Sequence, residues 1–575
     1  MPKSITCCDN SQAAAIPVAA SFLAPEKTSS CPRPVGVVSW TEIYETVPQK
    51  GSALTRNRST LTLAVAVLAV ALFTNSCTNY PSNVAQVLKD AGDNRAELEQ
   101  VLEHYRNGDD SLKYEAALYL IGNMGNHSFV TYYMHDTTDT ELPFNVLDYP
   151  DYDSLVKAVE VLQDEHGELD FGRHDPVYDY STITADFLTT QIDYAFRAWR
   201  ERPWARALSW EDFRDYVLPY RGSNEPLEEW RVELFDKYAT LPDEVTDSTD
   251  PVEAAALINR DIMTWFGFDP RFYYHPTDQG LLEMRTNGLG RCEDMTNVTI
   301  YAMRANGIGV TSDYTPYWAN TGNNHAWNAI VLPSGEVIPF MGAESNPGEY
   351  HLANNFAKVY RKTFNEQSQN LAFIEHKQEK IPGWLAGKYY RDVTEAYAST
   401  CDVEVVFEEQ VPDSVDLAYL CVFNSGEWKP IQWSKLANQT AVFKAMVPGI
   451  LYLPALYLNE EIAPFGDPFI LEDGCIQKLL TVAADEPAEM TLVSTTRRKQ
   501  VESTDGIATS YLTEGTQYEL QYWDDEWKTI DTLTAGRKPL EFTGVPAGGL
   551  YWLTEIDSNR EERPFTYDQG HQVWW

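Results

Sequence analysis

The pattern of apolar and polar positions changes character twice along the chain. In the first part, apolar residues recur every three or four positions, which is typical of amphipathic helices. Later the pattern becomes the alternation that is typical of strands, and after Ala396 it consists of short alternating runs with many turns. The helices expected in the first part are 83–105, interrupted near Gly92, then 111–124, 184–199, one that starts after Ser209, and one from Asp250 to about Trp265.

One predicted helix begins at a cysteine. Cys292 is followed by Met295, Val298, Thr299, Ala302 and Ala305 at helical spacing, and Gly307 is a stop signal, so Cys292 opens a buried helix. A thiol at a helix N-terminus feels the positive end of the dipole, which lowers its pKa and favours the nucleophilic thiolate. Cys292 is therefore a candidate nucleophile.

The next segment reads as a hairpin that carries a histidine. A strand from His325 is followed by the turn Pro333-Ser334-Gly335 and a second strand, Val337 to Phe340. If the hairpin is centred between Ser334 and Gly335, position 331 faces 338 and His325 faces Glu344. Pro339 cannot donate to the ladder and can shift this register. Nucleophile, base and orienting acid would then be Cys292, His325 and Glu344.

These motifs resemble the transglutaminase-like cysteine enzyme superfamily, which has G-x-C-x-D on a helix, H-A-W on the next strand and an acidic residue one strand later. Gly290-Arg-Cys292-Glu-Asp294 and His325-Ala-Trp327 match this pattern. Met341 stands where the family usually has Asp, so Glu344 would substitute for it. Other stretches, such as 213–221 and 339–344, are similar to multidomain Gram-negative lipoproteins that carry this domain, and this resemblance extends over nearly all of the chain beyond Cys77.

The resemblance implies an α+β papain/transglutaminase-like catalytic core at 206–380, preceded by a helical region at 77–205. Behind the core the sequence repeats itself. Three motifs, at 427–429, 447–452 and 464–465, recur about a hundred residues later, which predicts two tandem all-β sandwich modules at 396–485 and 486–575. Neither copy collects catalytic or metal-binding residues, so we expect spacers or binding modules.

The N-terminal segment contains a candidate export signal. Arg56 and Arg58 precede an apolar run, Leu61 to Phe73, and Cys77 follows shortly after. This pattern predicts a lipoprotein signal peptide at 56–76, with Cys77 lipidated, and makes 1–55 a leader or a misplaced start. Thr74 departs from the usual signal, and a short membrane anchor is the alternative. The mature protein would be lipid-anchored in a Gram-negative envelope, on its periplasmic or outer-surface face.

Composition narrows the function. The 575 residues carry a net charge of −41, which argues against nucleic-acid binding. The cysteines have no metal-ligand spacing, and no cofactor or metal is expected. Cys401 and Cys421 lie in one predicted β module, where they would form a disulfide, or Cys421 would be a buried free thiol.

Two functions follow from these observations. The first is an envelope cysteine enzyme that attacks peptide or carboxamide bonds through a thioester acyl-enzyme, with hydrolysis favoured over amine transfer and a peptide or protein as substrate. The second is a lipid-anchored peptide- or glycan-binding protein with a degenerate catalytic domain, which Met341 and the aromatic residues Trp574 and Trp575 favour. A scaffold role and the oligomeric state are left open.

Overall fold

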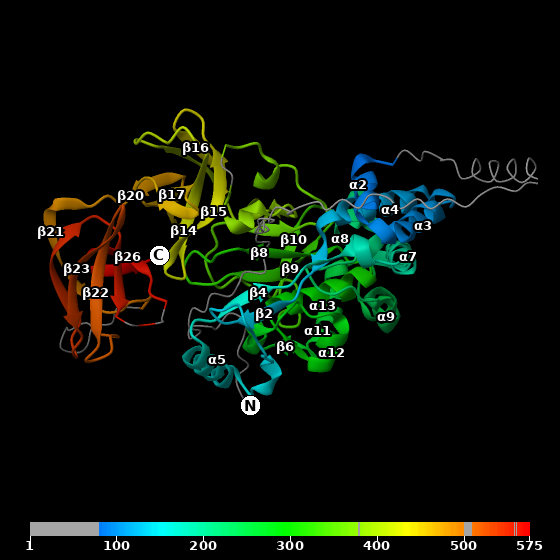
Figure 1. Ribbon diagram of the computed structural model, residues 1–575, viewed down its shortest axis with the longest axis horizontal. Coiled ribbons are helices and arrows are strands. Elements are labelled where there is room, and N and C mark those ends of the chain that lie inside the picture. The colour runs from blue at the N-terminus through cyan, green and yellow to red at the C-terminus, as the bar shows by residue number, and fades with distance from the viewer. Residues whose placement is uncertain (1–79, 378–379, 499–508, 557, 559–560) are drawn as a thin grey trace, which may run out of the picture.

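The molecule is elongated, with helices at one end, a mixed core in the middle and two β modules at the other end (Figure 1). The computed structural model describes residues 80–575 apart from 378–379, 499–508, 557 and 559–560. The predicted leader, signal peptide and lipidated Cys77 lie outside the described residues. Within the described part, no helix has the length and apolar character needed to cross a membrane.

The N-terminal helices form where their local sequence signals predict them, except the helix at 230–237, which the sequence analysis does not predict. At the start of α7 the side chain of Thr184 accepts a hydrogen bond from the amide of Phe187 (3.2 Å), and at the start of α8 Ser209 accepts from Asp212 (3.0 Å). Both are N-caps that satisfy otherwise unpaired amides. The helices are α2 (Ser82–Asp90), α3 (Arg95–Arg106), α4 (Ser111–Asn123), α7 (Ala185–Glu201), α8 (Trp210–Tyr216), α9 (Trp230–Lys237) and α11 (Pro251–Ile262).

The stretch between α4 and α7 contains a helix that the apolar pattern does not indicate. Helix α5 (Tyr152–His166) lies beside a small sheet, β3-β2-β4. Its only fully buried residues are Leu155 and Val159, so its apolar stripe is too short to stand out in the sequence. The strands of the sheet are β2 (Tyr132–His135), β3 (Glu141–Leu142) and β4 (Asp170–Arg173).

The helices before residue 205 share one hydrophobic cluster with the core that follows. Leu120 of α4, Ile192 of α7, Ile258 of α11 and Met295 all belong to it and are fully buried. The helical region and the core therefore bury their apolar faces against each other.

The core is a five-stranded sheet packed against the helix that Cys292 opens. Helix α13 (Cys292–Ala305) is buried along its whole length and ends before Gly307, whose φ of 71° suits the turn. The sheet order is β10-β9-β8-β11-β12, and the edge strand β12 continues the core past the boundary expected at 380. The strands are β8 (Val310–Thr315), β9 (His325–Val331), β10 (Val337–Phe340), β11 (Tyr360–Lys362) and β12 (Tyr390–Asp392).

The expected register of the β9–β10 hairpin is wrong by one residue. Val331 pairs with Val337 and not with 338, and Phe340 pairs with Asn328. The cause is the turn: the amide of Leu332 donates to the carbonyl of Glu336 (2.9 Å), which makes a three-residue loop with Gly335 at φ 85°. A glycine in the left-handed region is typical of such loops.

Glu344 does not face His325 across this ladder, because β10 ends at Phe340. The chain then turns, with Met341 bridged to Ser345 and Ala343 at φ 59°. The buried carboxamide of Asn259, on α11, holds the turn: it accepts from the amide of Ala343 (2.8 Å) and donates to the carbonyl of Ser345 (3.1 Å).

The two β modules have the same strand order. In the first, a sheet β15-β14-β17-β19-β20, with β18 paired to β17, is accompanied by the pair β13-β16. In the second, the sheet is β23-β22-β25-β26-β27 and the pair is β21-β24. The sequence repeat is thus a structural repeat. The strands are β13 (Cys401–Val406), β14 (Leu417–Asn424), β15 (Glu427–Lys435), β16 (Thr440–Met446), β17 (Ile450–Leu458), β18 (Glu461–Pro464), β19 (Phe469–Glu472), β20 (Ile476–Leu479), β21 (Ala483–Leu492), β22 (Gln517–Asp524), β23 (Glu526–Thr534), β24 (Leu540–Ala547), β25 (Tyr551–Glu555), β26 (Pro564–Asp568) and β27 (His571–Trp574).

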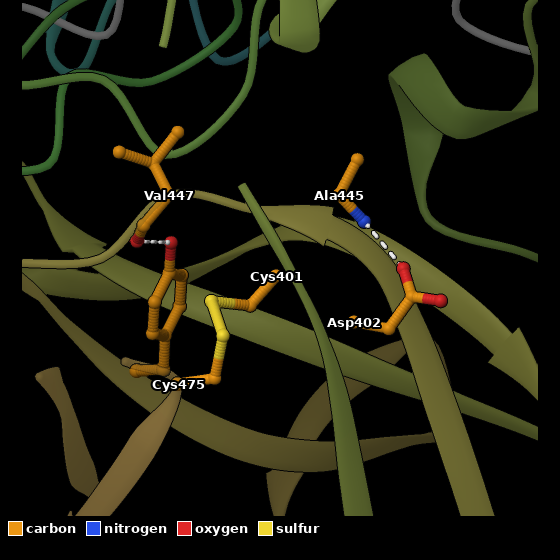
Figure 2. The surroundings of a disulfide bond; sticks show 6 residues. Cys401, Asp402, Ala445, Val447 and Cys475 are labelled. Carbon is orange, nitrogen blue, oxygen red and sulfur yellow. Dashed lines mark hydrogen bonds between the residues drawn. A yellow bond between two sulfur atoms is a disulfide. The ribbon is translucent and has the colours of Figure 1, made fainter. Parts of the chain in front are cut away.

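The first module contains a disulfide, and it is not the pairing considered from the sequence. Cys401 bonds to Cys475, at a Cα–Cα distance of 5.8 Å (Figure 2). Cys421 is a buried free thiol on strand β14, which lies between β15 and β17, and burial raises its pKa far above the usual range. The prediction of a buried free thiol at Cys421 is therefore confirmed, and a Cys401–Cys421 disulfide is wrong.

Aromatic rings join the two modules. Phe423 and Trp428 of the first module contact Trp523, Trp527 and Trp552 of the second, with ring centroids 5.2–6.0 Å apart.

The last two residues of the chain, Trp574 and Trp575, are less exposed to solvent than the sequence suggests. The indole N–H of Trp575 donates to Thr566 (3.0 Å), and Trp574 packs against Phe565. Both tryptophans are half-buried.

Candidate active site

The fold brings Cys292 and His325 to the same end of the core. Strand β8 returns antiparallel to α13, and its last residue, Thr315, pairs with His325. The side chain of Asn328 donates to the carbonyl of Thr296 (3.2 Å), which ties β9 to the first turns of α13. Cys292 lies about 6 Å before Thr296 along the helix and His325 about 10 Å before Asn328 along the strand. Both side chains are buried, with exposures of 7% and 6%.

The helix start at Cys292 is fixed by Asp294. One oxygen of its carboxylate accepts from the amide of Arg291 (2.9 Å), and the other accepts from the amide of Gln279 (2.9 Å). Asp294 is fully buried, and burial raises its pKa despite the charge of Arg291. The Asp of the G-x-C-x-D motif thus positions the backbone that carries the nucleophile.

A cation directly precedes the thiol. The guanidinium of Arg291, which is partly exposed, forms an ion pair with the buried carboxylate of Asp278. Burial opposes its charge, but Asp278 and Asp294 outweigh this, and the pKa of Arg291 is raised, with Cys292 contributing in the same direction. Arg291 therefore stays charged beside Cys292.

A second cation comes from β11. The ammonium of Lys362 contacts the carboxylate of Glu293 and lies 2.9 Å from the hydroxyl of Ser223. Burial lowers its pKa to about 8, although Asp278, Glu225 and Cys292 favour its charge. Both cations are paired with carboxylates, but a charge on Cys292 favours the charged form of each, so each in turn favours a thiolate at Cys292.

The imidazole of His325 is held by aromatic side chains. Its Nε2 atom lies 2.8 Å from the hydroxyl of Tyr350, and Trp318 stacks over the ring at a centroid distance of 5.8 Å. Trp327 lies on another side, at 5.9 Å. Tyr350 fixes the orientation of the ring, so the sequence-based triad omitted a residue that contacts the base directly.

Met341 stands at the position where the family usually has Asp, and its side chain has no acidic group. Met341 is fully buried in the main hydrophobic cluster. Glu344 lies in the turn that follows β10, and its side chain is half-buried. The structure therefore places Glu344 near the end of β10 and leaves Met341 as a packing residue.

A buried polar network stabilises β9 through the side chain of Trp327. The indole of Trp327 donates to the hydroxyl of Tyr397 (3.1 Å), which donates to Asp313 (2.7 Å). Asp313 also forms a two-hydrogen-bond ion pair with Arg361 (2.8 and 2.7 Å). No sequence motif indicates these partners, since they come from β8, β11 and the segment after β12.

The loop that presents Trp318 is fastened by both β modules. The side chain of Asn424 donates to the carbonyls of Trp318 (3.0 Å), Thr321 (3.0 Å) and Asn323 (2.9 Å). From the second module, Arg563 donates to the carbonyl of Ala319 (2.8 Å). The loop 316–324 therefore reaches its position beside His325 through contacts with the β modules.

The described residues contain no group of three or more His, Cys, Asp or Glu side chains that could hold a metal ion.

The comparisons with known proteins agree with the motifs. Residues 239–340 match the model of the transglutaminase-like superfamily, a segment that includes Cys292 and His325 and ends before Met341 and Glu344. The chain thus carries a transglutaminase-like core, for which a cysteine-type acyl-transfer or hydrolase activity is expected. Among solved structures, the chain is similar to a transglutaminase from red sea bream, with 10% identity over 78% of this chain and 77% of that one and a TM-score of 0.19. A TM-score this low says nothing further about the fold. A search of curated proteins gave no match.

Proposed function

We propose that the protein is a cell-envelope cysteine enzyme that cleaves peptide or carboxamide bonds through a thioester acyl-enzyme, with hydrolysis favoured over transfer to an amine. Cys292 is the nucleophile, His325 is the base, and Tyr350 orients the imidazole through Nε2. Glu344 is the acidic residue of the triad predicted from the sequence. The observation that carries the proposal is that Cys292 starts α13 beside two cations, Arg291 and Lys362, at the end of the core where His325 starts β9.

The chemical steps use these groups in order. Because Tyr350 engages Nε2 of His325, Nδ1 takes the proton of the Cys292 thiol. The thiolate attacks the carbonyl carbon, and the amide N–H of Cys292 stabilises the oxyanion. When the C–N bond breaks, the imidazolium gives its proton to the leaving amine and a thioester remains. Water then attacks the thioester, His325 takes its proton, and the acid and the Cys292 thiol are released.

The envelope location is part of the same proposal. The signal-like segment before Cys77 would place a lipid-anchored protein on the periplasmic or outer-surface face of a Gram-negative envelope. The disulfide between Cys401 and Cys475 supports an oxidising compartment, since disulfides are rare in reducing ones.

In this proposal the β modules help to position the loop beside His325. Each combines a five- or six-stranded sheet with a two-stranded one, and we interpret each as a β-sandwich. In the first module a hydrophobic cluster draws on β13 and β16 as well as on β14, β17 and β19. Because Asn424 and Arg563 fasten the loop beside His325, the modules act on the site itself and are more than spacers.

The thiol itself provides the test. The rate at which iodoacetamide alkylates Cys292 is followed against pH in the full chain and in His325→Ala, with the site of modification located by peptide mass spectrometry. We expect an apparent pKa well below the free-thiol value of about 8.5 in the parent and loss of this shift in the variant. An ordinary thiol pKa in both would refute the proposal. Cys292→Ala should abolish turnover of any amide substrate.

One observation favours the second candidate, a peptide- or glycan-binding protein with a degenerate catalytic domain. Met341, buried in the hydrophobic cluster, occupies the place of the family's Asp. A thiol that alkylates no faster than free cysteine, in a chain that still binds peptides, would support this alternative.

A further inference from the structure

A cavity of about 100 Å³ adjoins the candidate site, and neither Cys292 nor His325 lines it. It shares two wall residues with the surroundings of Cys292: Lys362 and Ser223, both in contact with Glu293, the residue after the nucleophile. Its volume has room for several water molecules or one amino-acid side chain. The wall also contains aromatic rings, from Tyr314, Phe364, Trp384, Tyr389 and Tyr390.

The charged side chains in the wall are all basic. Arg221, Arg304 and Lys362 are the cations that line the cavity, and no Asp or Glu is among the described lining residues. His127 also lines it, but burial lowers its pKa and favours the neutral imidazole. The nearest carboxylates lie behind the wall: Asp179 and Glu225 face Arg221, and Glu293 faces Lys362. A ligand in the cavity therefore meets cations first.

Arg304 is a buried cation whose hydrogen bonds go to the backbone. Its guanidinium donates to the carbonyls of Tyr216 (3.1 Å), Pro219 (3.3 Å), Arg221 (2.5 Å) and Val310 (3.4 Å). Burial lowers its pKa to about 10, partly offset by the charge of Glu225. It remains protonated at neutral pH, and its charge adds to the positive potential of the wall.

One residue of the cavity wall, Ser312, has an unsatisfied hydroxyl group. The hydroxyl of Ser312 has no hydrogen-bond partner, and the residue is only 2% exposed. A buried hydroxyl without a partner costs free energy, and such groups in native structures are typically completed by a ligand or water. Asn297, behind the lining residue Gly222, likewise has both polar atoms of its side chain unpaired. A Cβ at position 222 would lie 2.4 Å from Asn297 Oδ1, so any other residue there would displace the Asn297 side chain.

We propose that this cavity is the subsite for the acyl-donor part of the substrate and that it binds a short carboxylate-bearing chain. Lys362 and the hydroxyl of Ser312 hold the carboxylate, and the aromatic wall packs against the methylene groups. This assignment rests on the proposed function, because it places the ligand next to the Cys292 nucleophile. It narrows the substrate to amides whose acyl side carries an acidic group.

Glutarate, a five-carbon dicarboxylate, is a suitable probe, and glutaramide is its neutral counterpart. Calorimetry on the full chain should show binding of glutarate and at least tenfold weaker binding of glutaramide. Ser312→Ala should weaken glutarate binding about tenfold, and so should Lys362→Gln. Ser312→Ala keeps the test valid if Lys362→Gln does not fold, since removing an unpaired hydroxyl leaves no partner unsatisfied. Lys388→Gln is the matched control, because Lys388 lies beside the wall residues Gly387 and Tyr389 but does not line the cavity.

The position next to the nucleophile is tested separately. Bound glutarate should slow the alkylation of Cys292 by iodoacetamide, and Ser312→Ala should remove this protection. Equal binding of glutarate and glutaramide, an equal loss in Lys388→Gln, or binding without protection would each overturn the assignment. An activated thiol in a chain that does not bind glutarate would refute the subsite alone. If the chain binds glutarate but Cys292 has an ordinary thiol pKa, the proposed enzymatic function is refuted, and with it the role of the cavity as acyl-donor subsite.

Discussion

The Nε2 atom of His325 lies 2.8 Å from the hydroxyl oxygen of Tyr350. When the imidazole is protonated, Nε2–H donates to this oxygen, so the contact stabilises the imidazolium that accompanies a thiolate at Cys292. Tyr350 belongs to the segment after β10, where no motif marks it.

Replacing Tyr350 by Phe should weaken the catalytic pair without removing it. The loss of one hydrogen bond to a charged group should raise the apparent pKa of the Cys292 thiol by about one pH unit. The pH profile of iodoacetamide alkylation measures this change. Tyr419→Phe is the control, because it removes a buried hydroxyl that has no partner, on β14. An unchanged profile in Tyr350→Phe would show that Tyr350 only fills space.

Asn259 should be important for stability because it satisfies the backbone of the turn that carries Glu344. Asn259→Ala leaves the buried amide of Ala343 without its acceptor, which should cost about 1–3 kcal/mol of unfolding free energy. Urea unfolding of the core measures the loss. Asn107→Ala, which removes an exposed side chain at the end of α3, should change the free energy by less than about 0.5 kcal/mol. A similar cost in both variants would contradict the role of Asn259.

Features that depend on local sequence could be predicted. Nearby residues in the sequence determine three such features: the start of α13 at Cys292, the N-cap at Ser209 and the bounds of β10. The repeat of the β modules was also visible, because it preserves spacing and residue type over the whole module.

Features that depend on one dihedral angle or on distant partners could not be predicted. The hairpin register was wrong by one residue because Gly335 allows a three-residue loop where a two-residue one was assumed. Lys362 reaches Glu293 only because β11 lies beside β8 in the sheet. The pairing of Cys401 with Cys475 likewise depends on how the strands of the first module are arranged, which spacing in the sequence does not reveal.

Removing the disulfide should destabilise the first β module. The bond closes a loop with a sequence separation of 74 residues, and its loss should cost about 2–5 kcal/mol. The double variant Cys401→Ala/Cys475→Ala should therefore unfold at a lower denaturant concentration than the parent, as monitored by the fluorescence of the module's tryptophans. Reductant should shift the parent in the same direction and leave the double variant unchanged. If reductant shifted both equally, the effect would arise elsewhere.

Glu562 should make stability depend on pH. Burial raises its pKa to about 7, and the neighbouring charge of Glu555 acts in the same direction. The folded protein therefore binds a proton more tightly than the unfolded chain, so this group's contribution to stability is complete below about pH 4.5 and is lost as the pH rises through 7. Glu562→Gln removes the dependence. The difference in Tm between variant and parent should grow from pH 5 to pH 8, and a constant difference would contradict the assignment.

The β modules should influence the site through the loop 316–324. Asn424 donates to three carbonyls of this loop, so Asn424→Ala should loosen it and, with it, the stacking of Trp318 on His325. Hydrogen exchange should increase in the loop and not in α13, because α13 is buried along its whole length. Alkylation of Cys292 at pH 6 should slow about threefold to tenfold, since a less ordered imidazole stabilises the thiolate less well. Gln432→Ala is the matched control, because it removes another buried side-chain amide of the same module that forms no hydrogen bond with the loop. Faster exchange in the loop with an unchanged alkylation rate would show that the modules fasten the loop without affecting the nucleophile.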